Sequence, residues 1–254
     1  MLKSLHKNEI LSSEPLLILG GGSNILFTKD FSGLVLQSKL TGIEFIEQSD
    51  AYVYAKASSG EQWHNLVRLC VAQNLGGLEN LALIPGLCGA APIQNIGAYG
   101  VELSDVIIEV EGIDLRSGKF EVIKSSDCHF GYRESIFKHD FEKKFFISSI
   151  TLRLTKKNHQ INTGYSALDT YLKKKKIIKP SIQQVFESVV EIRSEKLPDP
   201  SVLGNAGSFF KNPVVDAAIF SKLQSDHPLI PFYHSDNQQF KIPAGWLIEQ
   251  AGWK

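Results

Sequence analysis

A serine hydroxyl stands between small residues and two aromatic side chains in residues 204–213, which read Gly-Asn-Ala-Gly-Ser-Phe-Phe-Lys-Asn-Pro. Small residues allow a ligand to approach the backbone closely. The two phenylalanines would exclude water, and Lys211 and Asn212 offer polar groups to an anionic or sugar-like partner. The arrangement suits a loop in which Ser208 donates a proton. Taken alone, however, such a segment is more often a turn that leads into a strand at Ser-Phe-Phe.

Three glycines follow a short apolar run near the start of the chain, in the sequence Gly20-Gly21-Gly22-Ser23-Asn24. Successive backbone N–H groups in such a loop can surround phosphate oxygens, and the Ser and Asn side chains add donors. The spacing differs from the dinucleotide fingerprint GxGxxG, because the sixth position counted from Gly20 is an isoleucine and no βαβ unit is evident. The residues alone therefore predict either a phosphate-binding loop or a simple turn.

Residues 76–100 are rich in glycine and show little periodicity, so they form either a disordered linker or an ordered loop around a ligand. Their apolar content favours an ordered loop. Backbone in residues 84–100 could lie close to a flat ring such as flavin, and Gln94 and Asn95 could hydrogen-bond its polar edge. The alternative is a buried loop that holds two domains together.

These stretches, together with residues 131–138, Gly-Tyr-Arg-Glu-Ser-Ile-Phe-Lys, resemble the UDP-N-acetylenolpyruvoylglucosamine reductases, the flavoenzymes usually called MurB. The motifs occur in the family's order, and the resemblance runs from about Leu16 to the last residue. It implies an α+β protein in which an FAD-binding domain, of the MurB or vanillyl-alcohol-oxidase-like (PCMH) kind, precedes a partial α/β substrate-binding domain.

The resemblance also implies an activity. Non-covalently bound FAD would be reduced by the co-substrate NADPH and would then pass a hydride to UDP-N-acetylglucosamine enolpyruvate. The product would be UDP-N-acetylmuramate, a peptidoglycan precursor.

Roles for individual residues follow from the same resemblance. Arg133 would face the enolpyruvyl carboxylate with a planar guanidinium, although an arginine beside Glu134 by itself indicates a surface ion pair. Ser208 would act as general acid. The implied FAD contacts are Gly20, Gly21, Gly22, Ser23, Asn24, Pro85, Gly86, Gly89, Ala90, Ala91, Gln94, Asn95 and Gly97. The implied substrate contacts are Tyr99, Tyr165, Lys196 and Asn212.

Some of these positions have a second interpretation. Ala90 and Ala91 stand where some relatives carry hydroxyl residues, so a flavin contact from their side chains is not expected. The family has two architectural types, and Tyr165 matches a tyrosine of the longer type. The resemblance implies that its hydroxyl binds the diphosphate of the substrate. Lys196 at a helix end is also explained by the helix dipole. The lysines at 173–176 and 179 are interpreted as a solvated face rather than a diphosphate site.

Composition limits the remaining possibilities. The 254 residues are 43% hydrophobic, and 27 basic residues balance 27 acidic ones, so no net charge favours nucleic acid or a membrane surface. Three cysteines without metal-ligand spacing predict free thiols, with no disulfide and no bound metal. Without a leader or an apolar run of about 20 residues, we expect a monomeric protein in the bacterial cytoplasm.

Hydrophobic patterns predict the elements that hold these residues. Strands are expected at 16–19, 34–36, 45–47, 52–57, 106–112, 120–123, 145–154 and 209–215. Helices are expected at 62–73, from a capping box at 181–184 to about 195, after an N-cap at Asp216, and at 243–250.

We expect three regions along the chain: an FAD-binding domain at 1–155, a linking and substrate-loop region at 156–196, and a substrate-binding domain at 197–254. By comparison with the family, several dozen residues would be missing at each end, including a C-terminal segment with a catalytic glutamate. The alternative to a working reductase is therefore an impaired flavin- or nucleotide-binding remnant.

Overall fold

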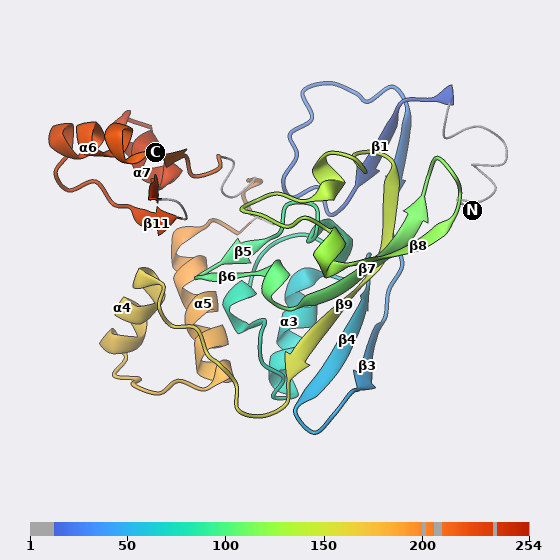
Figure 1. Ribbon diagram of the computed structural model, residues 1–254, viewed down its shortest axis with the longest axis horizontal. Helices are drawn as coiled ribbons and strands as arrows, with labels where there is room; N and C mark the ends of the chain where they lie inside the picture. The colour runs from blue at the N-terminus through green and yellow to red at the C-terminus, as the bar shows by residue number, and fades with distance from the viewer. Residues whose placement is uncertain (1–12, 200–201, 206–209, 236–237, 254) are drawn as a thin grey trace. The chain divides into compact units, whose positions relative to one another are not determined.

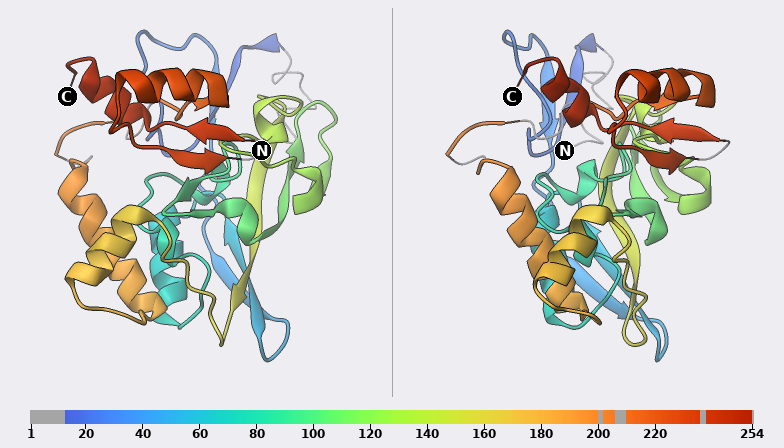
Figure 2. Two further views of the ribbon diagram at one scale, coloured as in Figure 1. Left: turned by 60° about the vertical axis from the view of Figure 1, so that its left-hand side comes forward. Right: turned by 90° about the vertical axis from the view of Figure 1, so that its left-hand side faces the viewer.

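A five-stranded antiparallel sheet in the order β3-β4-β9-β7-β8 is the centre of the first part of the chain. Its strands are β3 (Ile43–Glu47), β4 (Tyr52–Ser58), β7 (Ile107–Asp114), β8 (Phe120–Lys124) and β9 (Phe145–Thr155). Alternate residues of β4, namely Val53, Ala55 and Ala57, are buried, as period-2 burial of one sheet face requires. The β3–β4 hairpin extends from one end of this unit together with the end of β9 (Figures 1 and 2).

The computed structural model describes residues 13–199, 202–205, 210–235 and 238–253. The chain divides into two units, Met1–Asn205 and Ala206–Lys254, and each is described by itself.

Helices cover the sheet in successive layers (Figure 1). Helix α3 (Trp63–Ala72) buries Trp63, Leu66, Val67 and Cys70, which recur at helical spacing. Helix α5 (Ile182–Lys196) packs against α3, and α4 (Ser166–Lys174) packs against α5. A capping box between Ser181 and Gln184 starts α5, as the sequence predicts.

A small parallel pair, β1 (Leu16–Leu19) and β2 (Leu34–Gln37), positions the glycine loop that follows β1. Leu36 of β2 forms a buried cluster with Leu115 and Phe146, and Leu16 and Ile18 of β1 pack against it. Because Phe146 belongs to β9, this cluster anchors the pair to the five-stranded sheet.

The glycine-rich stretch 76–100 is an ordered loop, which confirms the preferred interpretation of its apolar content. It contains two short 3-10 helices, η1 (Glu79–Leu81) and η2 (Cys88–Ala90), and ends in β5 (Gly97–Ala98), which pairs with β6 (Val101–Glu102). The buried Trp63 donates from Nε1 to the Leu81 carbonyl at 2.9 Å, so α3 holds the start of the loop. Three more 3-10 turns follow, η3 (Leu103–Asp105), η4 (Ser125–Asp127) and η5 (Ile136–Lys138).

In the second unit, a three-stranded antiparallel sheet in the order β10-β12-β11 accompanies two helices. The elements are β10 (Val214–Val215), α6 (Ala217–Asp226), β11 (Tyr233–Ser235), β12 (Gln239–Lys241) and α7 (Ala244–Gln250). Phe220, Ile230 and Ile242 form its buried core.

Most predicted elements are present within a few residues of their expected ends, and one predicted strand is shorter. Asp216 caps α6 as predicted, by accepting from the Ile219 N–H. Of the described residues in the strand predicted at 209–215, only Val214–Val215 form a strand. Pro213, just before them, has no backbone N–H to donate to a neighbouring strand. Helix α4 and the β11–β12 hairpin were not expected. Helix α4 buries only Leu168 and Leu172, so its apolar pattern is short.

Candidate cofactor and substrate site

Two of the predicted ligand loops lie in direct contact, although they are more than sixty residues apart in the chain. A Cβ on Gly20 would stand 3.0 Å from the Ala90 Cβ, and a Cβ on Gly21 would stand 3.3 Å from the Gly86 Cα. Asn24 Nδ2 donates to Gln94 Oε1 at 3.4 Å. Small residues therefore allow the loops 20–24 and 84–100 to form one continuous surface.

Neighbouring strands hold this pair of loops in place. Gln37, at the end of β2, donates from Nε2 to the Gly20 carbonyl at 2.8 Å. Gly89 donates its N–H to the Ser59 carbonyl at 3.0 Å, just after β4. A Cβ on Gly89 would stand only 2.5 Å from the Ser59 Cβ, so glycine is required for this approach.

The surface formed by the two loops suits a phosphate-containing cofactor with a flat ring. Gly21, Gly22 and Asn24 are exposed, and Ser23 is half-buried. Gly22 has φ +73°, and no atom lies within 4 Å of the position its Cβ would take. The loop is thus exposed and open at Gly22, which suits a phosphate site.

Asn95 is buried inside the protein, with 0% of its surface exposed. Its Nδ2 lies 2.8 Å from Glu102 Oε2, 3.3 Å from Ser104 Oγ and 3.1 Å from the Gly131 carbonyl, and its Oδ1 accepts from the Ser104 N–H at 2.9 Å. These protein partners use the side-chain amide. Gln94, which is half-buried, has the more accessible amide of the two.

Arg133 lies against the same loop. Its Nη1 donates to the Asn95 carbonyl at 3.2 Å, and its Nη2 donates to the Gly97 carbonyl at 2.6 Å. Glu102 Oε1 is 3.9 Å from Nη1, and the guanidinium carbon is 5.4 Å from the centre of the Tyr132 ring. The cation is therefore oriented by backbone carbonyls beside the candidate flavin loop. A guanidinium has five N–H groups, so these two contacts leave donor capacity for an anion.

Tyr99 and Tyr165 come together at the end of the loop, with ring centres 5.3 Å apart in an edge-on arrangement. Asn80 holds this region because its Nδ2 donates to the Tyr99 carbonyl at 2.9 Å and to the Asn162 carbonyl at 2.8 Å. Burial raises the pKa of Tyr99 above its ordinary value, and Arg193 opposes that shift through a hydrogen bond and its charge.

Sequence reasoning missed Arg193. This residue donates from Nε to the Leu83 carbonyl at 3.3 Å, and burial lowers its pKa, while Tyr99 raises it. The Leu83 N–H in turn donates to Nδ1 of His64, whose ring stacks on Phe186. The available signal was an arginine on the partly apolar side of α5. Glu102, which faces Arg133, gave no signal because Arg133 is distant from it in the sequence.

Three predicted residues remain, Lys196, Asn212 and Ser208. Lys196 is the exposed last residue of α5. Asn212, in the second unit, accepts the Ala244 N–H at 2.9 Å and so holds the start of α7. Ser208 lies outside the described residues. The structure therefore brings together the two loops, Arg133, Tyr99 and Tyr165 within the first unit.

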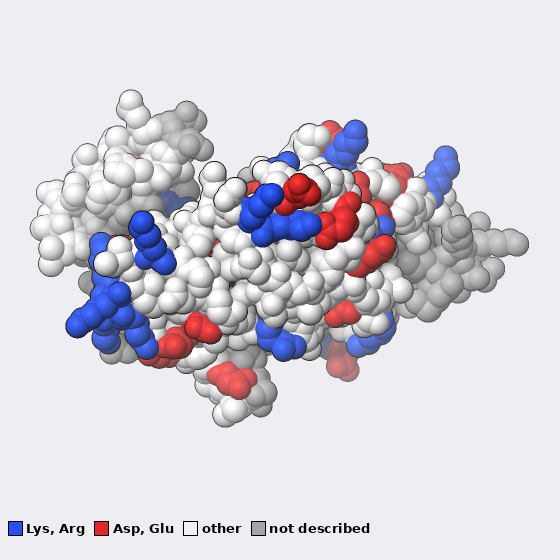
Figure 3. Space-filling model, turned by 90° about the horizontal axis from the view of Figure 1, so that it is seen from below, with Lys and Arg blue, Asp and Glu red and all other residues white. Residues whose placement is uncertain are grey.

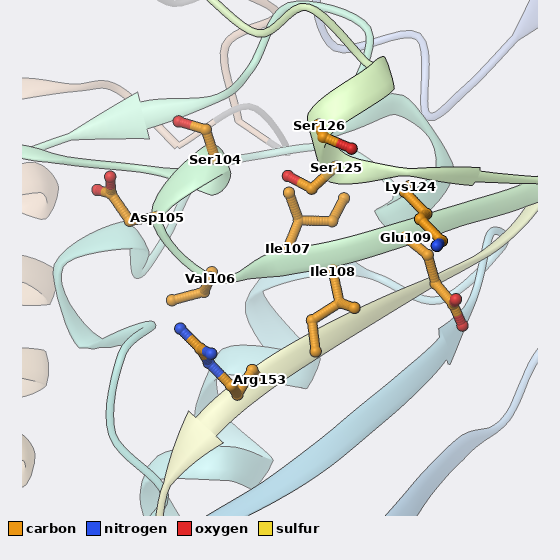
Figure 4. A pocket seen from close by; sticks show the side chains of 10 residues that line it. All are labelled: Ser104, Asp105, Val106, Ile107, Ile108, Glu109, Lys124, Ser125, Ser126 and Arg153. Atoms are coloured by element: carbon orange, nitrogen blue, oxygen red, sulfur yellow. The ribbon is translucent and has the colours of Figure 1, made fainter.

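A separate depression of about 350 Å³ lies beside β7 and is lined by none of the predicted site residues (Figure 4). Ser104 and Asp105 stand at one end, Lys124 and Glu109 at the other, and Arg153 of β9 lies below. Its mixed charges select no one kind of ligand.

Lysines 173–176, at the end of α4, and Lys179 are exposed, as predicted, and Figure 3 shows basic side chains gathered in this region. Lys173 pairs with Asp169 at 2.7 Å and Lys175 with Glu191 at 3.2 Å. These partners are typical of a solvated helix face.

The three cysteines are buried free thiols. Burial raises the pKa of Cys70 and of Cys128 to about 12. In the described part of the chain, no group of three His, Cys, Asp or Glu side chains is placed to hold a metal ion. None of the described helices combines the length and apolar character needed to cross a membrane.

Comparison with known proteins first defines the class. Residues 11–124 match the family model of an FAD binding domain, and residues 199–254 match that of the UDP-N-acetylenolpyruvoylglucosamine reductase C-terminal domain. The protein is therefore built from an FAD-binding domain and a reductase C-terminal domain in an α+β fold, as its motifs imply.

Individual relatives then identify the family. A UDP-N-acetylenolpyruvoylglucosamine reductase of Flavobacterium johnsoniae is 44% identical over 253 residues, which cover 100% of this chain and 74% of the relative. One from a Shewanella species (strain ANA-3) is 49% identical over 243 residues, covering 96% of this chain and 70% of the relative. The chain belongs to the UDP-N-acetylenolpyruvoylglucosamine reductase family.

A solved structure shares the fold. The crystal structure of MurB from Thermus caldophilus aligns with a TM-score of 0.57 over 99% of this chain and 71% of that one, at 20% identity.

Proposed function

We propose that this protein catalyses the NADPH-dependent, FAD-mediated reduction of UDP-N-acetylglucosamine enolpyruvate to UDP-N-acetylmuramate, in peptidoglycan precursor synthesis. Its family and FAD-binding domain support this activity. The geometric observation that carries the proposal is the contact between the two candidate cofactor loops, with the Arg133 guanidinium bound to carbonyls of one of them.

FAD fits the residues present. Residues 20–24 would hold its phosphates through backbone N–H groups, and residues 85–97 would lie along its ring. Gly86, Gly89 and Gly97 let this loop pack closely on Ser23, Ser59 and Glu102, respectively, which would hold it in shape for the cofactor. Bound FAD would supply the redox chemistry, taking reducing equivalents from NADPH and passing them to the enolpyruvyl group. Asn95 would contribute by fixing the loop rather than through its amide, because that amide is buried and engaged.

Arg133 would bind the carboxylate of the enolpyruvyl group. A planar guanidinium suits a carboxylate, and its charge stabilises the negative charge that grows on the substrate during reduction. Backbone carbonyls already orient the side chain, so little reorganisation is needed when substrate binds.

The remaining residues have substrate roles in this proposal. Ser208 would donate the proton that completes the reduction at the substrate carbon. Tyr99, Tyr165, Lys196 and Asn212 would bind the nucleotide sugar. Residues 1–155 would form the FAD domain and residues 197–254 a substrate domain. The proposal includes a monomer in the bacterial cytoplasm, where its soluble substrates would be available.

The test begins with flavin binding. The full chain is incubated with FAD, separated from free flavin by gel filtration, and its visible spectrum recorded; a near-stoichiometric flavin band is expected. The elution volume also reports the oligomeric state. The loaded protein should then oxidise NADPH only when UDP-N-acetylglucosamine enolpyruvate is present. Flavin retention without turnover would support the alternative of a non-catalytic flavin-binding protein.

Variants then test Arg133. Arg133→Lys keeps the charge but loses the planar pair of donors, so kcat/KM should fall by at least about tenfold, and Arg133→Ala should lower it further. Arg153→Ala is the matched control, because this arginine lies on β9 over the Tyr52 ring, 5.3 Å from its centre. Equal losses in the Arg133 and Arg153 variants would contradict the assignment.

A further inference from the structure

Two backbone carbonyls hold the Arg133 guanidinium in place. Its two terminal nitrogens donate to the carbonyls of Asn95 and Gly97, at 3.2 and 2.6 Å. Both carbonyls belong to the ordered loop that begins after α3. The guanidinium would therefore keep its place without any neighbouring acidic side chain.

The position of the Glu102 carboxylate is set independently. Its Oε2 accepts from Asn95 Nδ2 at 2.8 Å, and Asn95 is fully buried. Glu102 is also the N-cap of η3, where its side chain accepts from the Asp105 N–H and its own N–H donates to Asp105 Oδ2 at 2.8 Å. These contacts fix the carboxylate whether or not Arg133 is present.

The two charges nevertheless face each other. Glu102 Oε1 lies 3.9 Å from Arg133 Nη1, which is too long for a hydrogen bond but short for a Coulomb interaction. Gly97 leaves room for this approach, since a Cβ there would stand 2.9 Å from Glu102 Cγ and 3.0 Å from Arg133 Nη1. Because hydrogen bonds to other groups already hold each partner, the pair adds an electrostatic effect rather than a structural one.

We propose that Glu102 is a fixed counter-charge that limits how tightly Arg133 holds a carboxylate ligand, so that the carboxylate product leaves more readily. This inference rests on the proposed function, which places the substrate and product carboxylates at Arg133. A negative charge beside the cation offsets part of its attraction for a second carboxylate. The side chains are 30% and 34% exposed, so water screens the effect, and a two- to fivefold change in affinity, roughly that of an exposed ion pair, is expected.

The experiment compares two ligands on the FAD-loaded full chain by titration calorimetry. UDP-N-acetylmuramate carries the carboxylate, and UDP-N-acetylglucosamine lacks it. Glu102→Gln keeps an oxygen that can accept from Asn95 but removes the charge. We expect it to bind UDP-N-acetylmuramate about two- to fivefold more tightly, with unchanged affinity for UDP-N-acetylglucosamine. Glu47→Gln is the control, because Glu47 pairs with Lys156 on the sheet.

Two further measurements separate charge from structure. Glu102→Ala also removes the charge and should show the same selective tightening if Glu102→Gln does not fold. In an Arg133→Ala background, Glu102→Gln should have no effect on either ligand, because the counter-charge acts through the guanidinium. Product inhibition during turnover should be stronger in Glu102→Gln.

Weaker binding of UDP-N-acetylmuramate by Glu102→Gln would overturn the inference, because it would mean that the carboxylate helps to hold Arg133 in place. An equal change for both ligands, or no change, would overturn it as well. The proposed function fails by a different result, in which the unchanged protein retains no flavin or binds the two ligands with affinities that do not depend on Arg133.

Discussion

Replacing Asn95 with alanine should destabilise the first unit strongly, because one buried side chain joins three segments of the site. The amide contacts Glu102, Ser104 and Gly131, and it is fully buried. Alanine would remove a hydrogen bond to a charged group and leave the Ser104 N–H and the Gly131 carbonyl without this partner. Each such loss costs about 1–3 kcal/mol, and because water recovers part of it, we expect a net loss of about 3 kcal/mol.

Thermal unfolding followed by circular dichroism measures this loss. For a domain of this size, each kcal/mol lowers Tm by about 2–4 °C, so Asn95→Ala should melt about 6–12 °C earlier than the unchanged chain. Retention of FAD after gel filtration should fall too, because the loop that carries the candidate flavin contacts loses its side-chain contact with the Gly131 carbonyl.

A second asparagine provides the control. Asn95 has φ +42° and Asn158 has φ +54°, so both lie in the left-handed region that alanine enters at a cost of about 1 kcal/mol. Asn158 is exposed, so its replacement tests the backbone cost without burial. If Asn95→Ala and Asn158→Ala are destabilised equally, the reasoning about the buried amide is wrong.

Two further predictions concern the elements behind the site. Gly89→Ala should lower the free energy of unfolding by about 1–3 kcal/mol, because its Cβ would stand 2.5 Å from the Ser59 Cβ. Gly164→Ala is the control, because the nearest atom to its Cβ would be 3.6 Å away, and it should change the free energy of unfolding by no more than about 0.5 kcal/mol. Urea unfolding measures both changes. The pKa of His64 is lowered from 6.5, mainly by burial and also by two nearby arginines. Below pH 6.5 the unfolded chain binds a proton at His64 more readily than the folded protein does. Falling pH therefore favours unfolding. The free energy of unfolding is highest above pH 6.5 and decreases as the pH falls from there through the lower pKa of the folded state. Urea unfolding between about pH 7.5 and about pH 5 should show this loss, and an equal slope in His64→Phe would show that another group causes it.

The sequence by itself predicted the elements with strong local patterns. The alternation of Val53, Ala55 and Ala57, the spacing of the apolar residues in α3 and the capping box before α5 are all short-range features that the backbone must satisfy locally. The family motifs predicted the candidate residues, because loops with several glycines and paired amides are recognisable in linear order. Helix α4 was missed because two buried leucines are too few to make a periodic pattern.

Only the tertiary structure decided how the candidate residues relate. The loops 20–24 and 84–100 can touch because Gly20 and Gly21 have no side chains where they meet Ala90 and Gly86. The sequence does not reveal that these positions face one another. Asn95 and Gln94 are adjacent amides, yet one is fully buried and bonded to protein while the other remains partly accessible. Likewise, Glu102 meets Arg133 only because β5 and β6 fold back beside the Gly131 turn. Burial and hydrogen-bond partners depend on segments distant in sequence, so these residue environments follow from packing rather than from local composition.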